Sequence, residues 1–212
     1  MTSPVFTPKF AEQLHTLLIW RRDVRHFQTR PLEPGLLGTL LDLACLAPSV
    51  GNSQPWRFVQ VRSPERRAAI IAHVGAHNAK AAALYHDDER AAYDTLKLHG
   101  LIEAPEHLAV FCDMEPNEGR GLGRQTMRET LIYSTVLAIH TLWLAAQARG
   151  VGMGWVSILD PCAMAPLLDV QPDWRFIGYL CLGYPVDHHD VPELERRGWQ
   201  ARINQQQTKF IR

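Results

Sequence analysis

Residues 125–149, QTMRETLIYSTVLAIHTLWLAAQAR, are the stretch of sequence that most constrains the fold. The spacing of the apolar residues predicts one long helix, and Gly150 is the residue type at which helices end in left-handed geometry. Apolar side chains occur on nearly every side of this helix: Met127, Leu131, Ile132, Val136, Leu137, Ile139, Leu142, Trp143 and Leu144. Such a helix must be buried on nearly all sides. We expect a partner subunit to cover one face; the alternative is a central helix within a monomer.

Helices and strands alternate on both sides of this segment. Apolar periodicity and capping residues predict helices over 8–20, 33–47, 63–74 and 160–168. β-Branched and aromatic residues predict strands over 56–61, 108–112, 154–158 and 176–182. This alternation is typical of a layered α/β or α+β protein.

Two stretches fit the alternation less well. Residues 75–106 carry weak helical periodicity that charged residues interrupt, which indicates a surface excursion or a lid. The residues from Val186 onward are polar and irregular, as in an extended arm. We therefore expect one domain over 1–212, with a lid insertion at about 79–104 and a C-terminal arm at about 186–212.

The composition of the 212 residues excludes several classes of protein. Lys plus Arg and Asp plus Glu are 22 each, so the surface is not uniformly basic and we expect no nucleic-acid partner. The sequence lacks a run of about 18 apolar residues, so we expect no membrane-spanning helix. Its start lacks the basic and long apolar regions of a secretory signal. Four cysteines without a CxxC pair indicate buried, reduced thiols, and a cytoplasmic protein is the expectation.

Several common kinds of site are disfavoured by the sequence. Gly119–Arg124 is rich in glycine, but its spacing is not that of a dinucleotide-binding loop. His73 and His77 are four residues apart, yet the sequence offers no acidic or thiol ligand nearby to complete a metal site. Ser157 lies outside the G-x-S-x-G elbow of hydrolases. We expect no metal site in this chain.

The first segment that is harder to dismiss is RRDVRHF, residues 21–27, directly after the first predicted helix. It places three guanidinium groups within five residues, and arginine forks are suited to binding a phosphate. The arginines should also favour the charged form of Asp23. A solvated run of charges is the alternative interpretation.

The second such segment is APSVGNSQPW, residues 47–56, which joins a helix end to a strand. Ser49, Asn52 and Gln54 offer hydrogen-bonding groups between prolines, at positions suited to a planar heteroaromatic ring. An ordinary rigid turn is the alternative, and neither segment alone identifies a ligand.

Together, the two segments resemble the FMN-dependent nitroreductase superfamily. The matching motifs are RRDVRHF at 21–27, APSVGNSQPWRF at 47–58, GMGW at 152–155 and IGYLCLGYP at 177–185. The resemblance covers almost the whole chain. It implies an α+β sandwich with a central, mostly antiparallel sheet flanked by helices. It also implies an interlocked homodimer with FMN at the subunit interface, in agreement with the apolar helix over 125–149.

Within the superfamily, the chain most resembles the flavin destructases. The discriminating features are Asp23, where many nitroreductases have Ser, Ser157 within GWVSILDP at 154–161, and the segment 93–105. This resemblance implies an oxygen-dependent fragmentation of reduced FMN to 5,6-dimethylbenzimidazole, the lower ligand of vitamin B12, and erythrose 4-phosphate. It also implies a separate NAD(P)H-flavin reductase that supplies the reduced FMN.

Two other functions stay open at this point. The first is a conventional NAD(P)H-dependent FMN nitroreductase or flavin reductase, which keeps its FMN from one turnover to the next. The second is a flavin-binding or storage protein without enzymatic activity. An open flavin face, able to stack on nicotinamide, would favour the first.

The resemblance also implies roles for the site residues. Asp23 would act as a base near the ribityl hydroxyls, and Ser157 would bond the flavin near N5 and assist proton transfer. Residues 79–104 would form the lid that excludes water. Ser49, Asn52 and Gln54 would come from the same or the neighbouring subunit. The implied flavin-binding residues are Arg21, Arg22, Asp23, Val24, Arg25, Ser49, Asn52, Gln54, Leu96, Leu98, Trp155, Val156 and Ser157.

Overall fold

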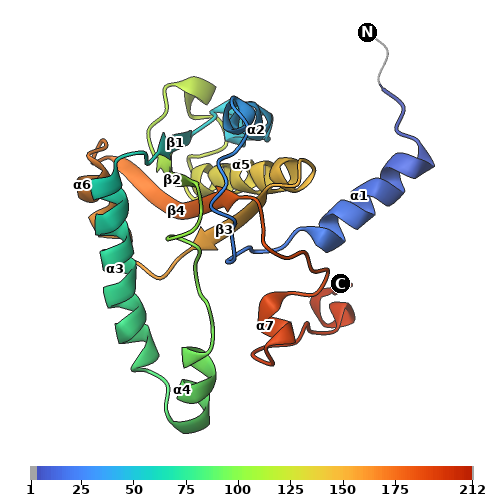
Figure 1. Cartoon of the computed structure of the whole chain (residues 1–212). Coiled ribbons are helices and arrows are strands. Elements are labelled where there is room, and N and C mark those ends of the chain that lie inside the picture. Colours follow the sequence, from blue (N-terminus) through green and yellow to red (C-terminus); the bar gives the residue numbers. More distant parts are fainter. Residues whose placement is uncertain (1–3, 212) are drawn as a thin grey trace.

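A computed structural model describes residues 4–211 of the chain (Figure 1). The remaining residues of the predicted single domain, 1–3 and 212, lie outside the described residues. The described chain forms a four-stranded antiparallel sheet with helices packed on both faces. The α+β sandwich with a mostly antiparallel sheet is therefore confirmed.

The sheet has the strand order β1-β2-β4-β3, and each neighbouring pair of strands runs antiparallel. The strands are β1 (Trp56–Gln60), β2 (Glu106–Asp113), β3 (Gly152–Val156) and β4 (Trp174–Gly183). All four predicted strands exist, but the strand predicted over 154–158 lies two residues earlier. Gly152 and Met153 already pair with β4, and the chain turns away beyond Val156, where Leu159 N–H donates to Ser157 O.

Alternate residues of the central strands face opposite layers, as strand geometry requires. Phe111 and Tyr179 belong to the core between the sheet and helices α3 and α6. Val110 and Leu180 belong to the core between the sheet and helices α2 and α5. These helices are α2 (Leu36–Ala44), α3 (Pro64–Ala82), α5 (Thr130–Gln147) and α6 (Pro161–Leu168). The sheet is thus the middle of three layers (Figure 1).

Helix boundaries differ from the predicted ones for local reasons. Helices α1 (Pro8–Trp20) and α6 match their predicted ranges. Helix α2 begins after Gly35, because the φ of 80° at this glycine is left-handed and cannot belong to a helix starting at residue 33. Helix α3 continues past Val74, because Gly75 keeps helical geometry and an alanine-rich stretch follows it.

Helix α5 is shorter than the helix predicted over 125–149, because turns precede it. Its end is as expected: Gly150 has a φ of 69°, and Val151 N–H donates to Ala146 O at 2.9 Å. By length and composition α5 could cross a membrane, although it contains no continuous run of about 18 apolar residues. In the structure α5 packs against the sheet and α2, and core helices of soluble proteins meet the same criterion.

Two helices present apolar faces that the chain leaves uncovered. On α5, Tyr133, Val136 and Leu137 are exposed. Helix α1 projects from the sheet (Figure 1), and its apolar side chains Phe10, Leu14 and Leu18 are also exposed. Apolar patches of this size mark interaction surfaces on soluble proteins. The expectation that one face of the apolar helix needs a partner is therefore consistent with the structure.

The predicted lid over 79–104 begins as the last turn of α3. Helix α4 (Asp87–Asp94) follows, and an extended stretch then returns the chain to β2. The C-terminal arm after β4 contains α7 (Glu193–Arg196) and a short 3-10 helix, η3 (Gln205–Thr208).

Lid and arm are packed together by aromatic rings. The ring of Trp199 lies edge-on to Tyr85 and Tyr93, with centroid distances of 5.4 and 6.2 Å. The Tyr93 hydroxyl donates to Asn78 Oδ1 at 2.7 Å, which fixes this cluster to α3. The lid can therefore move only if the arm moves with it or if this cluster separates.

A buried polar pair joins β2 and β4. His107 Nδ1 lies 2.9 Å from the Tyr179 hydroxyl, and both residues are buried. Burial, together with the positive charge of Arg67, lowers the pKa of His107 to about 4. His107 is thus neutral in the folded protein at pH values where an exposed histidine already takes up a proton.

We predict that folding stability falls as the pH drops from 6.5 toward 4, because His107 binds a proton more tightly in the unfolded chain than in the folded one. Across this window the His107 contribution lost is about 3 kcal/mol. Urea unfolding of wild-type and His107→Gln protein at several pH values measures this contribution. The other groups titrate alike in both proteins, so the difference between the two pH slopes belongs to His107. Equal pH slopes for the two proteins would contradict a neutral, buried His107.

Candidate functional site

Segment 21–25, the first of the two segments singled out in the sequence, lies along the edge of β3. Asp23 forms a parallel bridge with Met153, and Val24 N–H donates to Met153 O at 3.0 Å. Gly154 permits this approach, because a Cβ atom there would overlap the carbonyl oxygen of Val24. The segment therefore extends the sheet beyond β3 by a short stretch.

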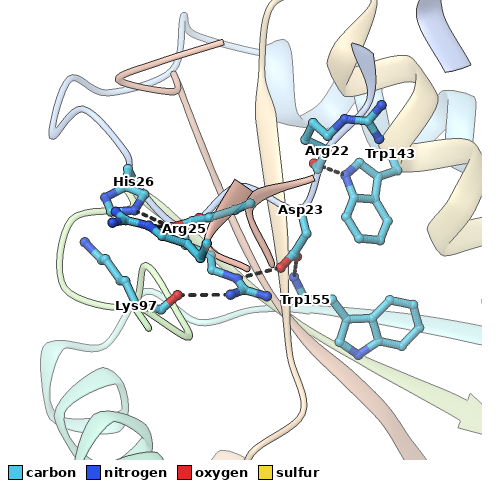
Figure 2. A network of polar contacts seen from close by, with 9 residues as sticks. Arg22, Asp23, Arg25, His26, Lys97, Trp143 and Trp155 are labelled. Carbon is cyan, nitrogen blue, oxygen red and sulfur yellow. Dashed lines mark hydrogen bonds and ion pairs between the residues drawn. The ribbon is translucent and has the colours of Figure 1, made fainter. Parts of the chain in front are cut away.

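Two hydrogen bonds hold the Asp23 carboxylate (Figure 2). Trp155 N–H donates to Oδ1 and Arg25 Nε–H donates to Oδ2, both at 2.9 Å. Burial raises the pKa of Asp23 above its ordinary value, while these hydrogen bonds and the Arg25 charge oppose the rise without cancelling it. Arg25 favours the charged form of Asp23, as the sequence predicts, but burial outweighs this effect and the net change is a raised pKa.

The guanidinium groups of Arg21 and Arg22 have separate partners. Arg21 stacks over the ring of Trp143, 4.8 Å from its centroid. Arg22 donates from Nη2 and Nε to Asp190 O of the arm, at 2.6 and 3.0 Å. Burial lowers the pKa of both arginines. They are part of a packed structure, which argues against the alternative of a solvated charge run.

A cavity opens beside Asp23, between this segment and the arm. The segment contributes Arg22, Asp23 and Arg25 to its wall, and the arm contributes Glu193, Arg196 and Arg197. A second cavity shares Asp23 and Arg25 with the first and is also lined by Arg21 and Arg202. The three arginines predicted to form an anion site therefore all line a cavity that Asp23 also lines.

The lid residues lie at different distances from this site. Arg25 Nη1 donates to Lys97 O at 3.1 Å, which ties the lid backbone to the segment (Figure 2). Leu98 borders a small cavity together with Asp23 and Arg25. Leu96 instead lines a separate cavity between α4 and the arm. The structure thus brings Leu98 to the site and places Leu96 away from it.

Of the flavin-binding residues predicted at the end of β3, two lie beside Asp23 and one does not. Val156 is buried and lines the same small cavity as Asp23, and the backbone of Trp155 holds the Asp23 carboxylate. Ser157 follows the last residue of β3 and is exposed. The prediction that Ser157 lies on this strand is wrong, because the strand ends at Val156. Its role near flavin N5 stays a prediction.

The second segment forms a loop at the start of β1. Ser49 Oγ accepts from Gln54 N–H at 3.0 Å, so its hydroxyl shapes the loop. Asn52 and Gln54 are exposed, and their φ angles of 57° and 46° lie in the left-handed region that costs such residues energy. A rigid turn is thus present, with its two amide side chains directed to the surface.

This loop contains η1 (Val50–Asn52) and packs against η2 (Glu118–Gly121). Among residues 4–211, the buried side-chain polar atoms without a hydrogen-bond partner are Ser53 Oγ and Arg124 Nη1. Both belong to this pair of loops, and buried polar atoms normally have partners. The loops therefore fit a surface that a ligand or another chain completes.

The two segments lie at opposite corners of the sheet. The second precedes Trp56 of β1, which is level with Arg175 of β4, whereas the first bridges Met153, which pairs with Leu182 of β4. They are separated by about 24 Å along the strands and about 19 Å across them, from the rise per residue and the strand spacing. One chain does not bring the segments together, and a site built from both requires two chains.

Two other groups from the sequence have structural roles. His73 Nε2 accepts from Asp160 N–H at 3.0 Å, next to the start of α6, and the described residues contain no group of three His, Cys, Asp or Glu that could hold a metal. All four cysteines are free thiols. Cys112 and Cys181 are buried as expected, whereas Cys45 and Cys162 are exposed.

The arrangement can bind an anion beside a carboxyl group that is a stronger base than an exposed aspartate. Sequence reasoning found the segment that carries this carboxyl, but it missed the arm residues of the cavity wall, Glu193, Arg196, Arg197 and Arg202. These residues lie in an irregular stretch without periodicity or a known motif. Their charge was visible in the sequence, but their place beside Asp23 was not.

Comparison with known proteins gives the same family at the levels of sequence and fold. A model of the nitroreductase family matches residues 18–184. A 5,6-dimethylbenzimidazole synthase from Rhodospirillum rubrum is 55% identical over 201 residues, which is 95% of this chain and 95% of the relative. Another, from Rhodobacter capsulatus, is 46% identical over 198 residues, 93% of this chain and 96% of the relative. The fold is similar to that of iodotyrosine deiodinase bound to FMN and 3-iodo-L-tyrosine, with a TM-score of 0.69 and 24% identity over 83% of this chain and 91% of that chain.

We predict that Gly154→Ala destabilises the protein by about 1–3 kcal/mol, because the added Cβ forces segment 21–25 away from β3. Gly75→Ala is the matched control: Gly75 lies inside α3 with open space around it, and the change should stabilise the protein by about 0.5–1 kcal/mol. Urea unfolding midpoints measure both. A Gly154→Ala protein as stable as wild type would show that the segment does not depend on this close contact.

Proposed function

The chain belongs to the nitroreductase family, and we propose that it acts as a 5,6-dimethylbenzimidazole synthase. This reaction consumes reduced FMN and O2 and releases 5,6-dimethylbenzimidazole and erythrose 4-phosphate. The observation that carries the proposal is the Asp23 carboxyl, with its raised pKa, inside a cavity lined by arginines. This cavity places a base, Asp23, next to arginines that can bind an anion.

The charges around Asp23 fit a phosphate-bearing flavin. Arg22 and Arg25 of the segment and Arg196 and Arg197 of the arm border the same cavity. Guanidinium groups bind phosphate through paired, charge-assisted hydrogen bonds. We therefore assign FMN binding to this cavity, with Val24 as part of its wall. Trp155 would contribute from the neighbouring small cavity, which Asp23 and Val24 also line.

Asp23 is the residue placed to remove a proton from the bound molecule. Breaking a C–C bond of the ribityl chain requires a hydroxyl proton to leave as the bond breaks, and a positioned carboxylate can accept it. The hydrogen bonds from Trp155 N–H and Arg25 Nε–H fix both carboxylate oxygens, and the raised pKa increases the basicity of Asp23. Reduced FMN, when bound, supplies the electrons that O2 accepts.

A homodimer would complete this site. Ser49, Asn52 and Gln54 lie at the far corner of the sheet from Asp23, so they can contact the same flavin only from the partner subunit. The exposed apolar faces of α1 and α5 supply a surface for that partner. We propose that each of two sites combines the Asp23 segment of one chain with the 49–54 loop of the other.

The lid would keep water away from the reacting flavin. Reduced flavin that meets O2 in bulk water releases hydrogen peroxide and yields no fragmentation product, so exclusion of solvent is a requirement of the reaction. Arg25 holds the lid backbone at Lys97, and Leu98 adds an apolar side chain beside Asp23. Ser157, exposed just after β3, would reach the flavin near N5.

The lid also bears on the alternative function, that of an NAD(P)H-dependent nitroreductase or flavin reductase. Such an enzyme needs an open flavin face on which nicotinamide can stack. The bond between Arg25 and Lys97 O places lid backbone over this region and favours an enclosed site. We propose that a separate NAD(P)H-flavin reductase supplies reduced FMN. Free cysteine thiols suit a reducing compartment, so we propose a cytoplasmic location.

Mixing the protein with reduced FMN in air-saturated buffer, followed by mass spectrometry, tests the function directly. The proposed activity yields 5,6-dimethylbenzimidazole without NAD(P)H. A reductase instead consumes NAD(P)H steadily with FMN retained, and a storage protein returns oxidised FMN unchanged. Absence of the benzimidazole in this assay would refute the proposal.

We predict that Asp23→Asn binds FMN within about threefold of wild-type affinity but makes no detectable product, because Asn keeps the shape of Asp while losing its basicity. In wild type, product formation should fall at acidic pH along a limb that lies above 3.8, the ordinary pKa of an aspartate. Flavin fluorescence titration and product quantification measure the two effects. Normal product formation by the variant would remove Asp23 from catalysis.

Ser157→Ala serves as the companion variant in the same assay. If Ser157 assists proton transfer at the flavin, turnover should slow by about 10²–10⁴-fold. Full activity of this variant would leave the Asp23 assignment intact and remove Ser157 from the site.

The two-chain site predicts complementation between inactive variants. Co-expressed Asp23→Asn and Asn52→Ala/Gln54→Ala chains form mixed dimers in which one site carries both changes and the other carries neither. Roughly a quarter of wild-type activity should return, since about half of the dimers are mixed and half of their sites are intact. Sedimentation should show twice the 24.0 kDa chain mass. No recovery, or a single 24.0 kDa species, would contradict the shared site.

A further inference from the structure

The C-terminal arm brings a second carboxylate to the Asp23 cavity. Glu193, the first residue of α7, lines this cavity together with Asp23, and its side chain is 11% exposed. Its Oε1 lies 3.2 Å from His26 Nε2 and 3.9 Å from Arg197 Nε. A carboxylate this deeply placed is costly unless it is paired, so these contacts determine where it lies.

The chain around His26 fixes the arm to the segment that carries Asp23. Val186 N–H donates to His26 O at 3.0 Å, and Gln28 N–H donates to Tyr184 O at 2.8 Å. Between them, Phe27 forms an antiparallel bridge with Pro185, two residues beyond the end of β4. Residues 184–186, where the arm begins, are therefore paired with residues 26–28. This pairing fixes the start of the arm that carries Glu193 next to the segment of Asp23.

The charge of Glu193 acts on Asp23 across this cavity. It raises the pKa of Asp23 in addition to the larger effect of burial, whereas Arg25 lowers it. The other charged or titratable groups around the two carboxylates are Arg21, Arg22, His26, His99, Cys181, Asp187, His189, Arg196, Arg197 and Arg202. Among these, His26 is the group that Glu193 contacts most closely.

We propose that Glu193 is a positioning residue for the reaction at Asp23, where it holds His26 at the cavity wall and sets the electrostatic field at the Asp23 carboxylate. The proposal rests on the proposed function, because it assigns a role within the same reaction. A like charge near a base increases its affinity for a proton, so the step in which Asp23 accepts a hydroxyl proton is favoured.

Glu193→Gln tests the electrostatic part, since it removes the charge and keeps the shape. The acid limb of kcat/KM for reduced FMN should move to lower pH by about 0.5 unit, the size expected for the loss of one like charge in a partly solvated site. We expect kcat to fall about three- to tenfold, with a change in KM of less than about twofold. A residue that merely stabilised the arm would change KM or stability and leave the limb in place.

Two matched variants separate charge from position. Glu195→Gln makes the same change two residues away on α7, at a side chain outside the cavity lining, and should leave the acid limb unchanged. Glu193→Asp keeps the charge, so the acid limb of kcat/KM should stay close to its wild-type pH. A limb that moves equally in Glu193→Gln and Glu195→Gln would overturn the proposal.

NMR of the flavin-free protein tests the contact with His26 independently of turnover. The chemical shifts of the His26 ring, assigned with a His26→Gln variant, should change in Glu193→Gln and stay the same in Glu195→Gln. Unshifted resonances in Glu193→Gln would overturn the pairing whether or not the protein makes product. If the His26 resonances change but the acid limb stays in place, Glu193 has no role in the reaction. If the wild-type protein makes no product, the proposed function itself is refuted.

Discussion

The absence of a side chain at Gly154 is the constraint on which the site depends. Because a Cβ atom there would overlap Val24 O, Gly154 allows segment 21–25 to lie directly against β3. In that position, Trp155 N–H donates to Asp23 Oδ1 at 2.9 Å. The geometry of the acid is therefore set by the sheet, which is the most rigid part of the fold, and not by the loop in which the acid lies.

The sheet that fixes Asp23 also keeps the two conspicuous segments of the sequence apart. With the strand order β1-β2-β4-β3, the loop before β1 and the segment beside β3 lie on opposite edges. Each corner alone is incomplete: one has arginines and a carboxyl, and the other has the unpaired polar atoms of Ser53 and Arg124. Two copies of the chain, joined through the apolar faces of α1 and α5, would allow the corners to meet. The proposed homodimer and the proposed two-chain site would thus follow from the same topology.

The sequence allowed the prediction of elements with a clear period, such as α1 and the central strands, because burial on a defined face leaves a regular pattern. It also identified the segment of Asp23 through its density of arginines. The separation of the two segments was not predictable, because strand order depends on long-range pairing that local patterns do not encode. The raised pKa of Asp23 was missed because it depends on burial, and Glu193 because an irregular arm carries no periodic signal.

The charges of the cavity explain how binding and chemistry are connected. Four arginines, Arg22, Arg25, Arg196 and Arg197, face three carboxyl groups, those of Asp23, Asp187 and Glu193. Protonation of Asp23 increases the positive excess, which favours an incoming phosphate. In the proposed function, a phosphate bound here would add negative charge near Asp23 and make this carboxyl a stronger base. Binding energy gained at the phosphate end of the molecule would then contribute to removal of a proton from its ribityl chain, which is how interactions remote from the reacting bond assist catalysis.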